Sequence, residues 1–104
     1  MQNKIRTYVN FAAKAGQLVF GVDAILQTKN VYLVFIEATL PLKMQEKLKQ
    51  KVKNQNMYAL QVLAEDMFLL TNKQNVKAIG IANISLADAI WQENKQSKLY
   101  AEVQ

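Results

Sequence analysis

The sequence predicts an α/β protein in which helices cover both faces of a largely parallel sheet, giving a three-layer α/β/α sandwich. Three observations support this fold class. Segments with the periodicity of amphipathic helices alternate along the chain with apolar segments rich in β-branched residues. The 104 residues suffice for one domain, and no linker or internal repeat divides them. Hydrophobic residues make up 51% of the chain and charged residues 20%, as is typical of globular proteins.

The first part of the chain predicts two helices joined by a short apolar segment. One helix is expected over about residues 3–14, with Gly16 ending it in the left-handed conformation. A short, mostly apolar segment at residues 17–20 leads to Gly21, where the next helix is expected to begin and to close near residues 29–30. A glycine before a helix leaves backbone N–H groups free and lets another backbone approach closely. Such a helix start suits an anion, for example a phosphate.

Three apolar segments predict strands of the sheet. Residues 31–36 are continuously apolar without alternation, which indicates a strand buried on both faces. Residues 57–63 and 76–82 predict two further strands, and Gly80 within the last one indicates close packing or a bulge. The loop at residues 37–41 follows the first of these strands. In open α/β sheets, ligands gather at such carboxyl ends.

Three more helices are expected between and after these strands. One covers about residues 41–54, with Pro41 in its first turn, where the missing N–H is tolerated. A second begins at Ala64, and a third spans about residues 84–96. A single domain is expected over residues 1–104, with about residues 95–104 as a frayed tail.

The charge balance favours a polyanionic partner. Thirteen Lys and Arg residues against eight Asp and Glu residues give a net charge of +5 and a pI near 9.5, which is typical of nucleic-acid-binding domains. Five of the lysines fall in the predicted helix at residues 41–54. They form either a solvated face whose alkyl chains cover the core or an electrostatic contact to a nucleic-acid backbone. These lysines are Lys43, Lys47, Lys49, Lys51 and Lys53.

The residue types that are missing argue against an enzyme. The chain has no Cys and no His, which excludes the usual nucleophile–base pairs and most transition-metal sites. It has neither a P-loop nor a Rossmann glycine pattern. Glu37, the best placed acid, has no partner base in the sequence. We therefore expect no catalysis, no metal, no cofactor and no small-molecule substrate.

The hydropathy pattern predicts a protein of the cytoplasm without a membrane partner. The longest apolar run has six residues, whereas about 20 are needed to cross a bilayer. No segment combines a basic start, an apolar run and a small-residue cleavage site.

The segment from Lys14 to Gln27 has the sequence KAGQLVFGVDAILQ. It places a basic residue, Ala and Gly at a helix end, then a short Leu-Val strand, then a glycine that opens the next helix. Over residues 12–26 this pattern resembles the L-seven-Ae/L-thirty-e family of kink-turn RNA-binding ribosomal proteins, and within it the bacterial YlxQ-like branch. The order of the remaining predicted elements is also similar. The resemblance implies an L-thirty-e-like fold with a four-stranded, mixed and mostly parallel sheet.

The resemblance also implies an RNA site at the start of the second helix. In kink-turn binders the opening glycine is followed by a variable residue, Asn and Glu, and then by Lys three residues further on. These residues contact the base edges of sheared G·A pairs. The matching positions here are Gly21, Val22, Asp23, Ala24 and Gln27. Ala cannot accept a hydrogen bond from guanine, Asp lacks the amide donor of Asn, and Gln lacks the charge of Lys.

A second RNA contact is implied for the loop after the fourth helix, near Thr71–Asn75, where Lys73 supplies charge. Lys14 and Gln17 are expected to contact the RNA backbone, which positions an RNA without specifying its sequence. The predicted function is a non-catalytic, ribosomal or ribosome-associated protein that recognises bent, kink-turn-like RNA, with ribosomal RNA as one such partner, by its shape. The alternative is a protein-interaction or scaffold module on the same fold that has lost the contacts to the bases.

Overall fold

The computed structural model describes residues 3–103, and within them helices and strands follow one another along the chain. The helices are α1 (Lys4–Lys14), α2 (Val22–Gln27), α3 (Leu42–Asn54), α4 (Ala64–Thr71) and α5 (Ile84–Ser97). The strands are β1 (Leu18–Phe20), β2 (Leu33–Glu37), β3 (Tyr58–Val62), β4 (Ala78–Ile81) and β5 (Ala101–Glu102). The predicted α/β class is confirmed. None of the helices in this part of the chain is long and apolar enough to span a membrane.

The strands form one mixed sheet in the order β1-β4-β2-β3-β5. Only β2 and β3 pair in parallel, and the other three pairings are antiparallel. The prediction of a four-stranded, mostly parallel sheet is therefore wrong in both strand number and direction. The reason lies in α4, which has only eight residues. It carries the chain along one edge of the sheet, so β4 starts at the edge where β3 ends and runs antiparallel to its neighbours.

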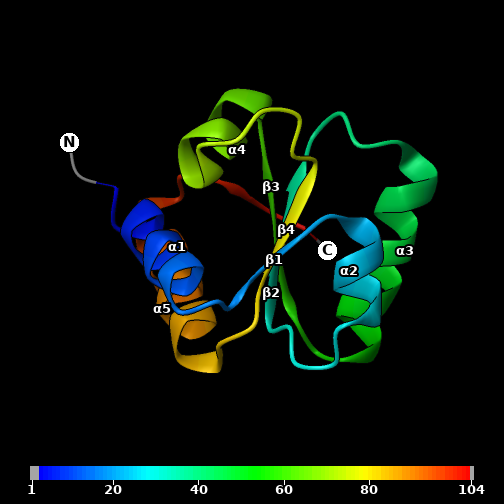
Figure 1. The fold of residues 1–104 in the computed structure, drawn as a ribbon, viewed down its shortest axis with the longest axis horizontal. Coiled ribbons are helices and arrows are strands. Elements are labelled where there is room, and N and C mark those ends of the chain that lie inside the picture. The colour runs from blue at the N-terminus through cyan, green and yellow to red at the C-terminus, as the bar shows by residue number, and fades with distance from the viewer. Residues whose placement is uncertain (1–2, 104) are drawn as a thin grey trace.

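Helices lie on both sides of the sheet, with α1, α4 and α5 on one side and α2 and α3 on the other (Figure 1). Two clusters of buried side chains fill the two interfaces. Strand β2 is buried along its whole length. Its Leu33 and Phe35 belong to the first cluster, whereas its Val34 and Ile36 belong to the second. This arrangement explains the lack of alternation in the sequence and confirms the prediction of a strand buried on both faces.

Gly80 allows close packing and does not form a bulge. The register around it is regular, since it pairs with Val34 on one side and Val19 on the other. A Cβ atom at this position would lie 2.9 Å from Cγ1 of Val31 and 3.3 Å from Cγ1 of Ile25. The missing side chain therefore lets α2 and the segment before β2 lie directly against the sheet.

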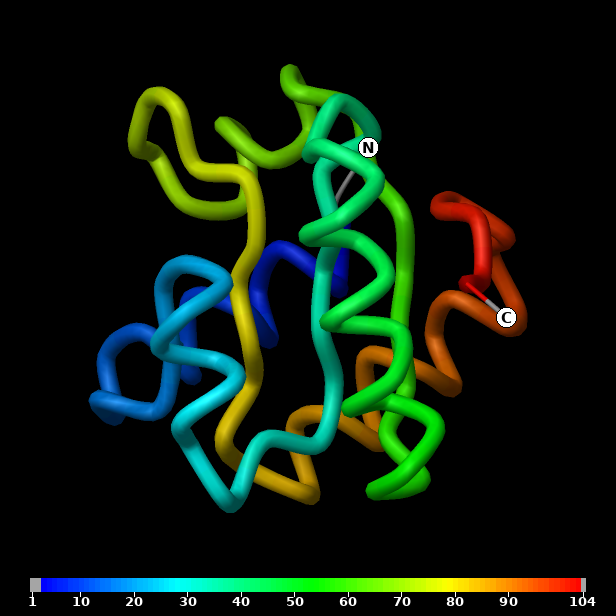
Figure 2. Tube along the Cα trace, turned by 90° about the vertical axis from the view of Figure 1, so that its right-hand side faces the viewer, coloured from blue at the N-terminus to red at the C-terminus, as the bar shows by residue number. Residues whose placement is uncertain are grey.

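Residues 95–103 form the end of α5, a turn and β5, which corrects the prediction of a frayed tail for this part of the chain. Helix α5 continues to Ser97, and the chain then turns back so that β5 pairs with β3 (Figure 2). The side chain of Asn94 is buried and bonds both backbone polar groups of one residue, donating to the Tyr100 carbonyl and accepting from the Tyr100 N–H, each at 2.9 Å. Tyr100 packs edge-on against Phe35. Gln104, the last residue of the predicted tail, lies outside the described residues.

Candidate nucleic-acid interface

The carboxyl ends of β1, β2 and β3 and the start of β4 meet at one edge of the sheet. Backbone hydrogen bonds tie the connecting segments together there. The Gly21 N–H donates to the Ala78 carbonyl, and the Glu37 N–H donates to the Lys77 carbonyl, each at 2.9 Å. We call this region the loop edge and define it as residues 20–24, 37–41 and 71–77. It joins three segments that are separated from one another in the sequence.

Gly21 opens α2 in a conformation that requires glycine. Its φ of 91° and ψ of 156° lie in a region that other residues essentially never occupy. A Cβ atom at this position would meet nothing within 4 Å. The backbone angle, and not lack of space, therefore accounts for the glycine. The open space also leaves the Gly21 backbone approachable from outside. No side chain caps the start of α2.

The exposed face of α2 carries three of the residues predicted to contact RNA. Asp23, Ala24 and Gln27 are exposed, and the spacing of four residues places Asp23 and Gln27 on the same side of the helix. Val22 differs from this group, because it is half-buried and packs against the second core cluster. Helix α2 ends at Gln27, earlier than the predicted end near residues 29–30, and it is only six residues long.

The loop after α4 lies beside the end of β1. The Lys73 ammonium sits 5.2 Å from the centre of the Phe20 ring, a cation–π contact across 53 positions of sequence. Phe20 is 39% exposed, and it was not among the residues predicted to contact RNA. An aromatic residue directly before the helix-opening glycine was the available signal. Asn72 and Asn75 adopt positive φ angles of 56° and 61°, which shape this loop.

Lys14 and Gln17 lie at the opposite edge of the sheet. Strand β1 separates them from Gly21, and its three residues span about 10 Å. The Gln17 side chain accepts a hydrogen bond of 2.9 Å from the amide of Asn83, the residue that caps α5. Gln17 therefore has a local structural contact, and Lys14 is exposed at the end of α1. The structure does not bring these two residues together with the loop edge.

Glu37 is a buried carboxylate at the loop edge with a complete set of partners. It accepts hydrogen bonds from the N–H and hydroxyl of Thr39, and it forms an ion pair with Lys77 at 3.0 Å. Burial by itself raises the pKa of this carboxyl, but the bonds from Thr39 and Lys77 outweigh it, so the pKa lies below its ordinary value. The pair neutralises Lys77, which leaves Lys73 as the free cation of the 71–77 loop.

Comparisons with known proteins find a similar fold in a solved structure but identify no family. No family model and no curated protein matches the chain. The structure is similar to a solved structure described as a protein with unknown function from Bacillus halodurans C. The two superpose with a TM-score of 0.79 at 18% sequence identity, over 90% of this chain and 99% of the other. This similarity shows that the two share a fold.

The loop edge combines groups that suit a polar ligand, and its free lysine, Lys73, favours a ligand with negative charge. It presents an open glycine backbone, the carboxylate of Asp23, a free lysine and an exposed aromatic ring. Gln27 adds an amide that both donates and accepts, further along α2. The described residues hold no cluster of side chains that could bind a metal ion.

Proposed function

We propose that this protein binds structured RNA of the bent, kink-turn type through the loop edge, as a non-catalytic ribosomal or ribosome-associated protein of the cytoplasm. One observation carries the proposal. The two segments that the family resemblance implies as RNA contacts are residues 21–27 and 71–75, and Lys73 of the second segment contacts Phe20, the residue directly before the first. The net charge of +5 supports an anionic partner of this kind.

Each group at this edge has a role in such a complex. The open backbone at Gly21 admits a close approach of the RNA, and Lys73 pairs with a phosphate. Asp23 accepts hydrogen bonds from base amino groups, and Gln27 exchanges donor and acceptor bonds with base edges. Recognition rests mainly on the bent shape of the RNA, because Ala24 offers no polar group to a base.

The test compares a kink-turn RNA with a straight duplex of equal length across a series of salt concentrations. The proposal predicts a preference for the kink-turn that persists where binding to the straight duplex has faded. A Gly21→Asp variant should lose this preference, because it adds negative charge and strain where the RNA approaches. Gly16→Asp is the matched control, since Gly16 also has a positive φ, at 70°, and open space around it, but lies at the opposite edge. Equal affinities for both RNAs would refute the proposal.

One feature of the loop edge supports the alternative function, a protein-interaction module. Several large apolar side chains are exposed at or beside this edge, which is more than a purely polar ligand requires. If the protein binds no RNA even at low salt, these side chains make a protein partner the better explanation. They are Phe20, Leu42, Leu63, Phe68 and Leu69.

A further inference from the structure

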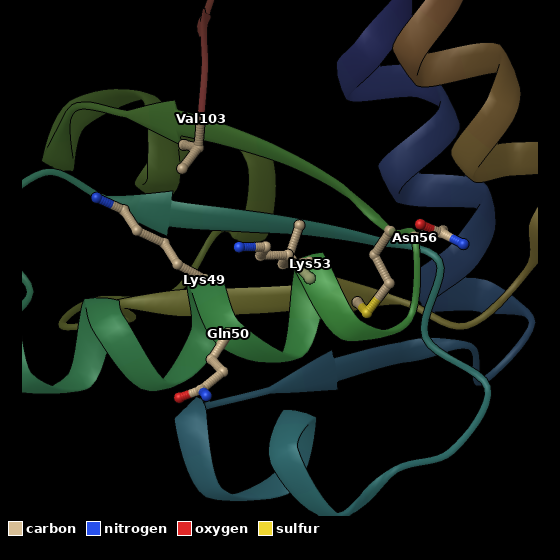
Figure 3. Close-up of a pocket in the computed structure, with 7 residues that line it drawn as sticks. Lys49, Gln50, Lys53, Asn56 and Val103 are labelled. Atoms are coloured by element: carbon tan, nitrogen blue, oxygen red, sulfur yellow. The ribbon is translucent and has the colours of Figure 1, made fainter.

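A groove of about 710 Å³ lies between α3 and the segment that follows β5. Helix α3 begins at the loop edge, and the groove lies along its second half, toward the edge where β3 begins. Figure 3 shows Lys49 and Lys53 on the side of α3 that faces Val103, whereas the Gln50 amide points away from Val103. The lining combines apolar with basic and amide side chains: Val52, Met57 and Val103 with Lys49, Gln50, Lys53 and Asn56.

The structure separates the lysines of α3 into groups with different roles. The Lys51 ammonium faces α2 and donates to the carbonyl oxygens of Leu26 at 3.5 Å and Thr28 at 3.1 Å. Lys49 and Lys53 lie on the groove side and are exposed. Among residues 3–103, neither of these two ammonium groups forms an ion pair. Lys51 is therefore a structural contact, and the groove has two free cations.

We propose that this groove binds a single-stranded RNA segment along its phosphate backbone. Lys49 and Lys53 are four residues apart, so their positions on α3 are about 6 Å apart along the helix axis. This separation suits two successive phosphates of one strand. The apolar side chains of Val52 and Met57 offer a surface for the riboses. No aromatic side chain lines the groove, so stacking on bases is absent and the contact is independent of sequence.

This inference rests on the proposed RNA-binding function, because the charge of the groove alone also suits an acidic protein segment. The groove and the loop edge lie at opposite ends of α3. One RNA can therefore place its kink at the loop edge and a flanking single strand in the groove. The groove would then add affinity without adding preference for a kink.

The test uses a 12-nucleotide oligouridylate, which cannot form a kink-turn, and measures its binding by fluorescence anisotropy over a series of salt concentrations. Removing two lysine–phosphate contacts makes the negative slope of log K against log salt less steep by about 1.4, because each contacted phosphate of a single strand contributes about 0.7. A Lys49→Gln/Lys53→Gln variant should show this decrease. The ratio of the parent protein's affinity to the variant's affinity should then fall about sevenfold between 50 and 200 mM salt. The matched control is Lys4→Gln/Arg6→Gln, which removes the same charge from exposed positions of α1 on the other side of the sheet.

A second variant probes the groove without removing a lysine. Val103→Glu places a negative charge in the wall, while the backbone bond from residue 103 to the Ala59 carbonyl stays available. It should weaken oligouridylate binding at an unchanged thermal midpoint. Equal effects of the groove variant and the α1 control would overturn the proposal, as they would indicate diffuse attraction. Displacement of the RNA by polyglutamate of equal charge would overturn it in favour of an acidic protein partner.

The two proposals fail in different ways. The Lys49→Gln/Lys53→Gln variant should keep the ratio of affinities for kink-turn and straight RNA. If that ratio is one in the parent protein while oligouridylate binding depends on the groove, the function proposed for the loop edge is wrong and the groove stands. If the ratio is high and the groove variant behaves as the parent, the groove proposal alone is wrong.

Discussion

Replacing Gly80 by Ala tests how the packing of the sheet positions α2. Gly80 lies in β4, and the added Cβ atom would sit 2.9 Å from Cγ1 of Val31 and 3.3 Å from Cγ1 of Ile25. Carbon atoms at their best separation are about 3.5–4.0 Å apart. The neighbours must therefore move by roughly 0.5–1 Å. Val31 is buried and β-branched, so it has little freedom to rotate away.

Such overpacking in a filled core typically costs about 1–3 kcal/mol. For a domain of this size, that loss lowers the thermal midpoint by roughly 5–20 °C. Ile25 belongs to α2, so the same displacement moves the helix that carries Asp23 and Gln27. We therefore expect Gly80→Ala to reduce the preference for kink-turn RNA although residue 80 is buried and contacts no RNA.

Urea unfolding measures the loss of stability, which should appear as a lower midpoint at an unchanged slope. A double-mutant cycle with Val31→Ala identifies its cause. Removing the Val31 methyl groups makes room for the new Cβ atom, so the double variant should be more stable than the sum of the two single losses by about 1–2 kcal/mol. Additive losses, or a Gly80→Ala variant as stable as the parent protein, would refute the assignment of this glycine to close packing.

Three further variants test contacts elsewhere in the fold. Glu37→Gln should lower the free energy of unfolding by about 1–3 kcal/mol at neutral pH. Because the pKa of this carboxyl is lowered on folding, its contribution to stability is present above the ordinary pKa of 4.5 and is lost as the pH falls through the folded pKa. In urea titrations at several pH values, the difference in stability between the variant and the parent protein should therefore decrease toward acid pH. Asn94→Leu leaves the Tyr100 N–H and carbonyl unpaired, which should lower the free energy of unfolding by about 2–4 kcal/mol and speed hydrogen exchange over residues 101–103. Unchanged exchange would contradict the proposed role of the Asn94 side chain. Lys51→Met should lower the free energy of unfolding by about 1 kcal/mol, whereas the control Lys47→Met should change it by less than about 0.5 kcal/mol.

Most elements of the fold were predictable because local patterns determine them. The continuous apolar run before Glu37 marked a fully buried strand, and Gly21 marked the start of α2. The directions of the strands were not predictable in this way. Whether a helix crosses the sheet or follows its edge depends on its length and on tertiary contacts, and α4 is short enough to follow the edge.

The ordered C-terminus had no local signal either. Strand β5 has two residues, and it depends on Asn94 bonding the backbone N–H and carbonyl of Tyr100, six positions further on. The side chain of Asn substitutes for a backbone partner there, and periodicity does not reveal such a bond.

The candidate site was predictable only where its residues are neighbours in the sequence. The exposed group on α2 follows from helical spacing. The contact between Lys73 and Phe20, the separation of Gln17 from Gly21 by β1, and the pairing of Lys77 with Glu37 all depend on how distant segments meet. The division of the α3 lysines into a structural contact and two free groove cations likewise required the positions of α2 and Val103.

The most direct test of the central claim is a map of amide chemical shifts in the ¹⁵N-labelled protein as a kink-turn RNA is added. The proposed interface predicts that the largest changes fall on residues 20–27 and 71–77, with smaller changes along the groove side of α3. Changes confined to α1 and α5, or equally spread over all exposed lysines, would contradict RNA binding at the loop edge.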